Sequence, residues 1–410
     1  MRPLRPLRFI HNPEVILKPT PFHPRTSVLC ESHAWRRWSG YVAASSYELS
    51  HEREYHSIRN AAALLDITPL YKYRVQGPDA ARLLDRVVPR NVARAKVGDV
   101  LYTPWCDARG KVIDDGTIAR LGDEVFRMTA ADPNLRWLED CATGLDVRID
   151  DVSEQVAALA LQGPMSRAIL TRLTEGGTDG LKFFRLVATA IRGVPVEISR
   201  TGYTGDLGFE IWMDAAHALK VWDALIEVGA DYGITPAGML ALDVARIEAG
   251  LMLIDVDYVS ARKALIDNQL SSPFELDLGW TVNTDKPSFV GKAALVAEKA
   301  RGPAWQFVGV EVEWDSFERL YTDVGLAPRV PIPAWRMSVP LYDGGEQAGY
   351  ATSGGWSPLL KKYIALAHLQ SKWAPPGTRL EMEITVEHRR KRALATVVKK
   401  PFFNPERKRA

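Results

Sequence analysis

Two short stretches of the chain share one frame, and this repeat limits how the chain can fold. Residues 75–87 read VQGPDAARLLDRV and residues 161–173 read LQGPMSRAILTRL. A Gly-Pro pair is typical of the end of a strand, and proline is tolerated where a helix begins. Each copy therefore predicts a strand that leads into an amphipathic helix, and the pair indicates two related α+β modules, with chance similarity of so short a frame as the alternative. The positions expected to be buried are Leu83, Leu84, Ile169 and Leu170.

The last third of the chain has a different pattern. Short apolar runs, separated by turn residues, occupy 307–314, 339–354, 380–387 and 392–400. Evenly spaced short strands of this kind predict a small all-β barrel or sandwich. Before this region, residues 214–229 predict a helix with Asp214 at its N-cap.

Charge and hydropathy exclude several classes of protein. The 410 residues carry a formal net charge of +2, which is not the basic field of a nucleic-acid-binding protein. No run approaches the roughly 18 apolar residues of a spanning helix, so we expect no membrane partner. The arginine-rich start has no apolar secretory core, and Pro3 and Pro6 would interrupt a targeting helix. We expect a short extended arm there.

Motifs for nucleotides and metals are missing from the sequence. The glycines of TGYTGDLG, residues 201–208, belong to a predicted hairpin turn and not to a G-x-G-x-x-G that opens a helix. No group of His, Cys and Asp residues has metal-ligand spacing, so we expect no metal. Cys30, Cys106 and Cys141 are odd in number and widely spaced, which predicts reduced thiols in a cytoplasmic protein.

Glu210 is a carboxylate inside an apolar strand, between Phe209 and the run 211–213. A buried charge without a partner is costly, so the carboxylate requires a donor. A flat heterocycle with adjacent N–H and NH₂ groups would engage both carboxylate oxygens at once. The alternative is an acid that faces solvent or pairs with Arg200 across the hairpin.

Two acids stand next to each other in KVIDDGT, at Asp114 and Asp115. Successive side chains of a strand face opposite ways, so only one of the two can enter a given pocket. That one could act as a general acid or base, or stabilise a cationic intermediate. The alternative is a hairpin with two surface acids.

Taken together, these stretches resemble the aminomethyltransferase family, whose founding member is the T-protein of the glycine cleavage system. The resemblance runs from about residue 20 to residue 403. The stretches that carry it are GKVIDD (110–115), LQGP (161–164), SRTGYTGDLGFE (199–210), RIEAG (246–250), FVGKAAL (289–295), TSGGWSP (352–358) and VVKKPF (397–402).

The resemblance implies an α+β fold, a ring of three domains around a central hole that holds tetrahydrofolate. Two domains are the related α+β modules and the third is the small C-terminal β-barrel. We expect residues 1–65 with 155–287 to form the first, folate-binding domain. Residues 66–154 would form the second α+β domain, and residues 288–410 the barrel domain.

The resemblance also implies a set of site residues. Asp115 matches the acid beside the reactive nitrogens of the folate, and is the predicted catalytic residue. Glu210 matches the carboxylate that binds the N3–H and 2-amino group of the pterin. The further contacts expected with the cofactor are Tyr203, Tyr102, Trp280 and Thr129, the last standing where the family has an Asn.

Other positions depart from the family pattern. Leu242 replaces an Arg that helps to bind the pterin, and Leu251 replaces a Tyr. The segment 318–342 is longer than its counterpart in T-proteins. Aromatic residues in 34–41 would suit a small apolar substrate near the entrance, although packing between domains explains them equally well.

These departures favour a tetrahydrofolate-dependent demethylase, which moves a methyl group from a small O-, N- or S-methylated substrate to N5 of tetrahydrofolate. Tyr71 or Tyr102 could then help to move the proton. The alternative is an aminomethyltransferase of the glycine cleavage system, which makes 5,10-methylene-tetrahydrofolate and requires a lipoyl carrier protein. A second alternative is a folate-binding protein without catalysis, but its relatives carry a Cys signature that is missing here.

Overall fold

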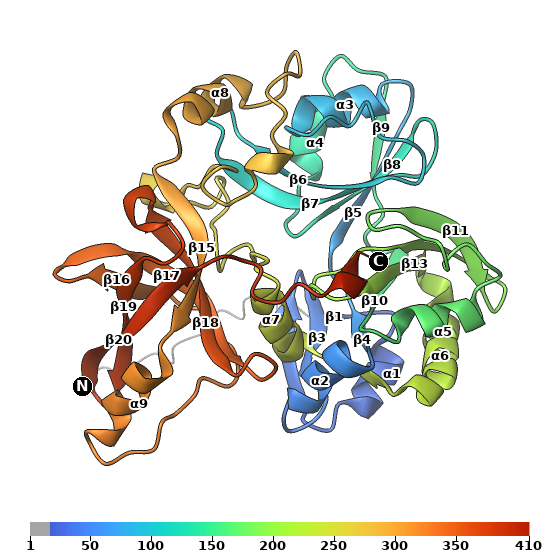
Figure 1. The fold of residues 1–410 in the computed structure, drawn as a ribbon. Coiled ribbons are helices and arrows are strands. Elements are labelled where there is room, and N and C mark those ends of the chain that lie inside the picture. The colour runs from blue at the N-terminus through green and yellow to red at the C-terminus, as the bar shows by residue number, and fades with distance from the viewer. Residues whose placement is uncertain (1–16, 410) are drawn as a thin grey trace, which may run out of the picture.

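The computed structural model describes residues 17–409, and Figure 1 shows how they are arranged. The arm expected at the start of the chain falls in residues 1–16, outside the described residues. Within residues 17–409 the strands form three open sheets and one closed barrel. No helix in this part of the chain is long and apolar enough to cross a membrane.

The second copy of the repeated frame lies in the largest open sheet, of order β11-β12-β13-β10-β4-β14. In this copy β10 leads into α5, which packs beside α6 on one side of the sheet (Figure 1). The elements are β4 (Ala62–Asp66), β10 (Val156–Gln162), β11 (Leu186–Ile191), β12 (Val194–Ser199), β13 (Gly208–Asp214), β14 (Ile234–Pro236), α5 (Ser166–Leu173) and α6 (Ala218–Gly229).

The first copy lies in another open sheet, of order β6-β7-β8-β5-β9, where β5 leads into α3. The elements are β5 (Tyr71–Gln76), β6 (Val100–Cys106), β7 (Val112–Arg120), β8 (Val125–Ala130), β9 (Arg148–Asp151), α3 (Ala80–Val87) and α4 (Leu135–Cys141). The strand-to-helix units predicted from the repeat are therefore confirmed. Fully buried, as expected, are Leu83, Leu84, Ile169 and Leu170.

The C-terminal strands close into an antiparallel barrel of order β15-β18-β17-β16-β19-β20, so the chain forms the barrel and not the sandwich. Alternate residues point inward and fill it, as Val310, Ala365 and Met382 do. Helix α9 packs on β20. The elements are β15 (Trp305–Val312), β16 (Val339–Asp343), β17 (Glu346–Ser357), β18 (Lys362–Gln370), β19 (Arg379–Val386), β20 (Arg389–Val398) and α9 (Trp314–Thr322).

The remaining elements connect these units. A small sheet of order β1-β3-β2 comes first in the described chain. Before α6, the turn η1 (Ala215–His217) begins at the predicted N-cap, where the carboxylate of Asp214 accepts the N–H of Ala216 at 2.8 Å. The other elements are β1 (Lys18–Pro19), β2 (Ala34–Trp38), β3 (Tyr41–Ser46), α1 (His23–Leu29), α2 (Glu52–Asn60), α7 (Met239–Glu248) and α8 (Lys292–Arg301).

The barrel and the two larger sheets surround a central region, and α7 lies at the edge of that region beside the barrel (Figure 1). This arrangement confirms the predicted α+β ring with a C-terminal barrel. The domain boundaries expected from the resemblance stay a prediction.

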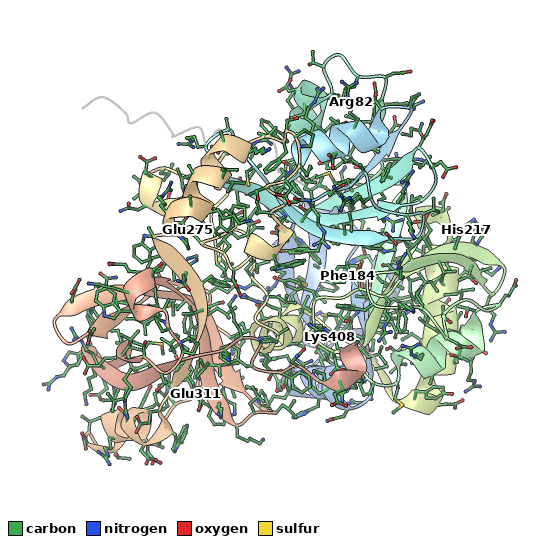
Figure 2. All side chains as sticks on the ribbon, turned by 45° about the horizontal axis from the view of Figure 1, so that its top comes forward. Arg82, Phe184, His217, Glu275, Glu311 and Lys408 are labelled. Carbon is green, nitrogen blue, oxygen red and sulfur yellow. The ribbon has the colours of Figure 1, made fainter. Side chains whose placement is uncertain are left out.

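The end of the chain returns from the barrel to the largest open sheet, where Lys408 is labelled in Figure 2. The guanidinium of Arg407 donates to both carboxylate oxygens of the buried Asp206, at 2.6 and 2.8 Å. Arg200, which follows β12, donates to the main-chain oxygen of Lys408 at 3.1 Å. These bonds tie the tail to the hairpin that contains Glu210.

A buried carboxylate joins α7 to the barrel. Glu248, at the end of α7, accepts from both Nε and Nη2 of Arg59, at 3.0 and 2.6 Å. It also accepts the hydroxyl protons of Tyr55 in α2 and Ser357 in β17. All four side chains are buried. Such a charge is stable only with its partners in place, because a buried ion left unpaired is strongly destabilising.

We therefore expect Glu248→Ala to lower the free energy of unfolding by about 3–5 kcal/mol, since it leaves the Arg59 guanidinium buried without its carboxylate. Urea denaturation followed by fluorescence measures the loss. The matched control is Glu227→Ala, which breaks an exposed pair with Arg192 and should cost less than about 1 kcal/mol. Equal losses for the two variants would contradict this account of the junction.

Candidate functional site

Asp115 is held at both carboxylate oxygens. It lies on β7, opposite Pro104 of β6. Its Oδ2 accepts the hydroxyl proton of Tyr102 at 2.8 Å, and its Oδ1 accepts that of Tyr258. Burial raises the pKa of Asp115, while the two hydroxyl donors act in the opposite direction because they favour the charged form.

Asp114 faces the other way, as strand alternation predicts for adjacent residues. Its Oδ1 accepts the N–H of Asp115 at 2.7 Å, and its Oδ2 accepts the N–H of Asp132 and Nδ2 of Asn134, at 2.9 and 2.8 Å. It is fully buried, and burial raises its pKa well above the ordinary value. The two acids therefore have different surroundings, and Asp114 is bound by its neighbour Asp115 and by the loop that follows β8.

Glu210, on β13, is bound at one oxygen. Thr201 donates its hydroxyl proton to Oε2 at 2.6 Å. No other hydrogen bond reaches the Glu210 carboxylate from residues 17–409, so Oε1 remains an open acceptor. Burial raises the pKa of Glu210, and the Thr201 bond and the charge of Arg127 oppose that shift. The donor is thus a neighbour in the same hairpin, and one of the two oxygens is unused.

Asp115, Tyr102, Tyr203 and Glu210 share an unusual environment. All four are surrounded by protein deeply enough for desolvation to be the main influence on their pKa values. Yet each side chain is only partly buried by surface area. Each of the four side chains therefore has protein around it and keeps some surface that a ligand could contact.

Tyr203 lies shortly before Glu210 in the chain, and the charge of Asp115 acts on it. It belongs to the loop between β12 and β13, the same loop that carries Thr201. Its hydroxyl donates to the main-chain oxygen of Met252, and the charge of Asp115 contributes to the raised pKa of this phenol. Burial is the main cause of the raised pKa of Tyr203, and the charge of Asp115 adds to it.

The other two predicted contacts have different positions. Thr129, on β8, is almost fully buried, and its hydroxyl accepts the N–H of Thr117 at 2.9 Å. Trp280 lies in the turn η4 (Gly279–Thr281) and is 63% exposed. Its ring stacks on that of Tyr102 with 6.2 Å between the centroids. Trp280 therefore lies beside Tyr102, the tyrosine that binds Asp115. The Thr129 hydroxyl, by contrast, is hydrogen-bonded within its own sheet. All six assignments to catalysis or cofactor binding stay predictions.

Tyr258 was not found by sequence reasoning. It follows α7 in an irregular segment, 143 residues from Asp115 in the chain, and no motif or spacing marks it. Its neighbour Asp257 is fully buried and accepts from Arg246, from the N–H of Leu253, and from the hydroxyls of Thr352 and Ser353 on β17. The barrel thus holds the segment that brings Tyr258 to Asp115.

Leu242, on α7, has an apolar environment. It is 6% exposed and belongs to an apolar cluster that includes Ile58 of α2 and Leu65 of β4. The next residue, Asp243, accepts Nε of Arg336 at 2.8 Å. Arg336 belongs to the long segment 318–342, so this segment reaches back onto α7 beside Leu242.

No group of three or more His, Cys, Asp and Glu side chains that could hold a metal ion occurs within residues 17–409. In the same range Cys30, Cys106 and Cys141 are free thiols. The acids described above are bound by hydroxyl, amide and guanidinium donors instead.

Two known domain families match successive parts of the chain. Residues 24–286 match the GCVT N-terminal domain, and residues 324–404 match the glycine cleavage T-protein C-terminal barrel domain. An aminomethyltransferase from Halothermothrix orenii is 35% identical over 382 residues, which are 92% of this chain and 96% of that protein. One from Desulforamulus reducens is 33% identical over 360 residues, covering 86% and 90%.

A solved structure has the same fold. The glycine cleavage system aminomethyltransferase T from Bartonella henselae superposes with a TM-score of 0.80 at 25% identity, covering 95% of this chain and 98% of that chain. The resemblance found in the sequence is therefore confirmed over nearly the whole chain.

The raised pKa of Asp115 leads to a prediction about stability. A carboxylate whose pKa is higher in the folded protein than in the unfolded chain destabilises the fold at pH values above the folded pKa. Asp115→Asn removes that penalty, so at pH 8 the variant should melt at a higher temperature than the wild type. The difference should shrink as the pH falls to about 4, where about half of the wild-type carboxyl groups are protonated in the unfolded chain. Calorimetry at both pH values measures it, and a gap that widens at low pH would contradict the assignment.

Proposed function

The chain belongs to the glycine cleavage T-protein family, and we propose that it transfers a one-carbon group to tetrahydrofolate in the space that Glu210 and Asp115 line. Enzymes of this family use tetrahydrofolate, which carries one-carbon units at its N5/N10 edge. The observation that supports the proposal most is the open oxygen of Glu210, on a deep carboxylate whose other oxygen is already bound.

A pterin supplies the donors that Glu210 lacks. Its N3–H and 2-amino group point the same way, at a spacing that matches the two oxygens of a carboxylate. Thr201 holds Oε2 in place and leaves a lone pair there for a second donor, while Oε1 is unoccupied by protein. Burial raises the pKa of Glu210, while the Thr201 hydroxyl and then the positive charge of Arg127 act in favour of the ionised form, which accepts both bonds.

Asp115 provides a fixed negative charge. The hydroxyls of Tyr102 and Tyr258 hold its two oxygens, so the carboxylate is oriented before any ligand arrives. A preorganised charge in a site of low dielectric stabilises positive charge that develops on the reacting one-carbon unit. We assign Asp115 this role, and assign Tyr102 and Tyr258 the task of holding it.

For the transferred group we propose aminomethyl, with 5,10-methylene-tetrahydrofolate as the product. The relatives that match 86% and 92% of the chain are aminomethyltransferases, and these matches favour this reaction over the demethylase. The reaction requires a lipoyl carrier protein as partner. We propose neither nucleic acid nor a membrane as a binding partner. We place the protein in the cytoplasm because its cysteines are unpaired.

Demethylation remains the second candidate because of the changes around α7. Leu242 is packed in an apolar cluster, and Arg336 from the long segment 318–342 is bound to the next residue. The tip of the β2–β3 hairpin also lies against the end of β8, where Ser39 donates to the main-chain oxygen of Ala131 at 3.3 Å. These contacts favour a smaller substrate than a lipoyl arm.

The products of the reaction distinguish the two candidates. The purified protein is incubated with tetrahydrofolate and either an aminomethylated lipoyl carrier or methylated small molecules, and the folates are resolved by mass spectrometry. We expect 5,10-methylene-tetrahydrofolate with the carrier only. 5-Methyl-tetrahydrofolate formed from a methyl donor would overturn this in favour of demethylation, and binding without any product would indicate the non-catalytic alternative.

Two substitutions separate binding from turnover. Glu210→Ala removes a bidentate, charge-assisted contact and should weaken tetrahydrofolate binding by about a hundred-fold, as measured by calorimetric titration. Asp115→Ala should leave that affinity within a few-fold and lower the turnover number by about 10²–10³-fold, since it removes the charge that stabilises the transition state. Normal folate binding by Glu210→Ala would show that the pterin lies elsewhere.

A further inference from the structure

A chain of buried polar side chains leads to Glu210. The hydroxyl of Thr201 donates to Oε2 of Glu210 at 2.6 Å, and the hydroxyl oxygens of Thr201 and Ser199 lie 2.8 Å apart. The indole N–H of Trp212 donates to the Ser199 hydroxyl at 3.3 Å. The side chains of Trp212, Ser199 and Thr201 are all buried. The proposed pterin anchor is therefore the last member of a hydrogen-bonded series that the hairpin itself supplies.

The two ends of this chain determine the direction of every bond in it. An ionised carboxylate only accepts, and an indole N–H only donates. Because the hydroxyl proton of Thr201 is used at Glu210, Thr201 must accept the proton of Ser199. The Ser199 side chain makes no other hydrogen bond within residues 17–409, so its proton has an acceptor only at Thr201. The chain therefore runs one way, from the indole to the carboxylate.

A proton on Oε2 of Glu210 would conflict with this direction. Glu210 would then donate to Thr201, and Thr201 would donate to Ser199. The Ser199 proton would be left buried without an acceptor, which costs free energy. The chain thus disfavours protonation of Glu210 at the oxygen that Thr201 holds.

The neighbouring open sheet holds the far end of the chain. The guanidinium of Arg127, on β8, lies 4.2 Å from the centroid of a Trp212 ring. Arg127 also forms an ion pair with Glu197, which lies opposite Trp212 across β12 and β13. The contact between the two α+β modules therefore fixes the indole from which the chain starts.

We propose that Ser199 and Thr201 are positioning residues of the pterin anchor, whose directed hydrogen bonds keep Glu210 an ionised acceptor with Oε1 open for the ligand. This inference rests on the proposed function, because it takes Glu210 to bind the N3–H and the 2-amino group of tetrahydrofolate. Both residues act through Glu210, and neither is assigned a contact with the folate.

The pH dependence of folate binding reports on this role. The ionised form of Glu210 binds the pterin, so affinity is lost as the pH falls through the pKa of Glu210. Burial raises that pKa, and the Thr201 bond and then the charge of Arg127 oppose the shift. The neighbouring strands add no charge, since the residues opposite Glu210 are Ala160 on β10 and Ser199 on β12. Breaking the chain removes part of the opposition, so the loss of affinity should begin at a higher pH.

The test measures the affinity for tetrahydrofolate by calorimetric titration between about pH 5 and pH 8. We expect Ser199→Ala to match the wild type within about three-fold at pH 8, and to lose affinity with a midpoint about half to one pH unit higher. Thr201→Val removes the donor itself and should shift the midpoint at least as far. Adding Ser199→Ala to Thr201→Val should shift it no further, because Ser199 acts through Thr201. Titration of the folate itself is common to all these measurements.

Two further variants serve as controls, and circular dichroism checks that each variant is folded. Ser199→Thr keeps the hydroxyl and should restore the wild-type midpoint. Ser166→Ala makes the same change as Ser199→Ala at another buried serine, on α5. The Ser166 hydroxyl has no hydrogen-bond partner within residues 17–409, so this variant should also keep the wild-type midpoint.

The remaining outcomes count against the inference. A wild-type midpoint in Ser199→Ala overturns it and leaves the proposed function intact. A loss of affinity that is equal at every pH would assign Ser199 a purely structural role and overturn it as well. If Ser199→Ala does not fold, an unshifted midpoint in Thr201→Val is the contradicting result. If the wild type binds no tetrahydrofolate at any pH, the proposed function fails and this inference falls with it.

Discussion

The buried carboxylate of Asp257 holds the segment that carries Tyr258, one of the two hydroxyl donors to Asp115. It binds Arg246 at the end of α7, and it accepts hydroxyl protons from Thr352 and Ser353 of the barrel. This arrangement helps to fix an irregular segment in which the next residue is Tyr258, together with the bond from the N–H of Ala261 to the main-chain oxygen of Val112 on β7. The docking of the barrel on α7 thus contributes to placing one of the two hydroxyl donors of Asp115.

The two central carboxylates are held in different ways that suit different tasks. Asp115 has a hydroxyl donor on each oxygen, so its orientation is complete in the free protein. Glu210 has one donor and one open oxygen, and in our proposal the pterin supplies the remaining donors. A charge for stabilising a reacting group and an anchor for recognition can therefore occupy the same space.

Local patterns in the sequence predicted much of this structure. The Gln-Gly-Pro repeat, the cap at Asp214 and the opposite orientation of Asp114 and Asp115 all follow from neighbouring residues, and the structure bears them out. Tyr258 could not be predicted in this way, because its contact with Asp115 spans 143 residues. The hydrogen bonds of the buried Lys286 ammonium could not be predicted either. Their acceptors are main-chain oxygens about 200 residues away, which have no sequence signature.

The central claim is that Glu210 and Asp115 line one space that holds tetrahydrofolate. A crystal structure of the protein with tetrahydrofolate tests it directly. Our account predicts that N3 and the 2-amino nitrogen of the pterin each lie within about 3.2 Å of a Glu210 oxygen, with the N5 edge turned toward Asp115. A folate bound elsewhere, with Glu210 contacting only Thr201 as it does in the free protein, would contradict it.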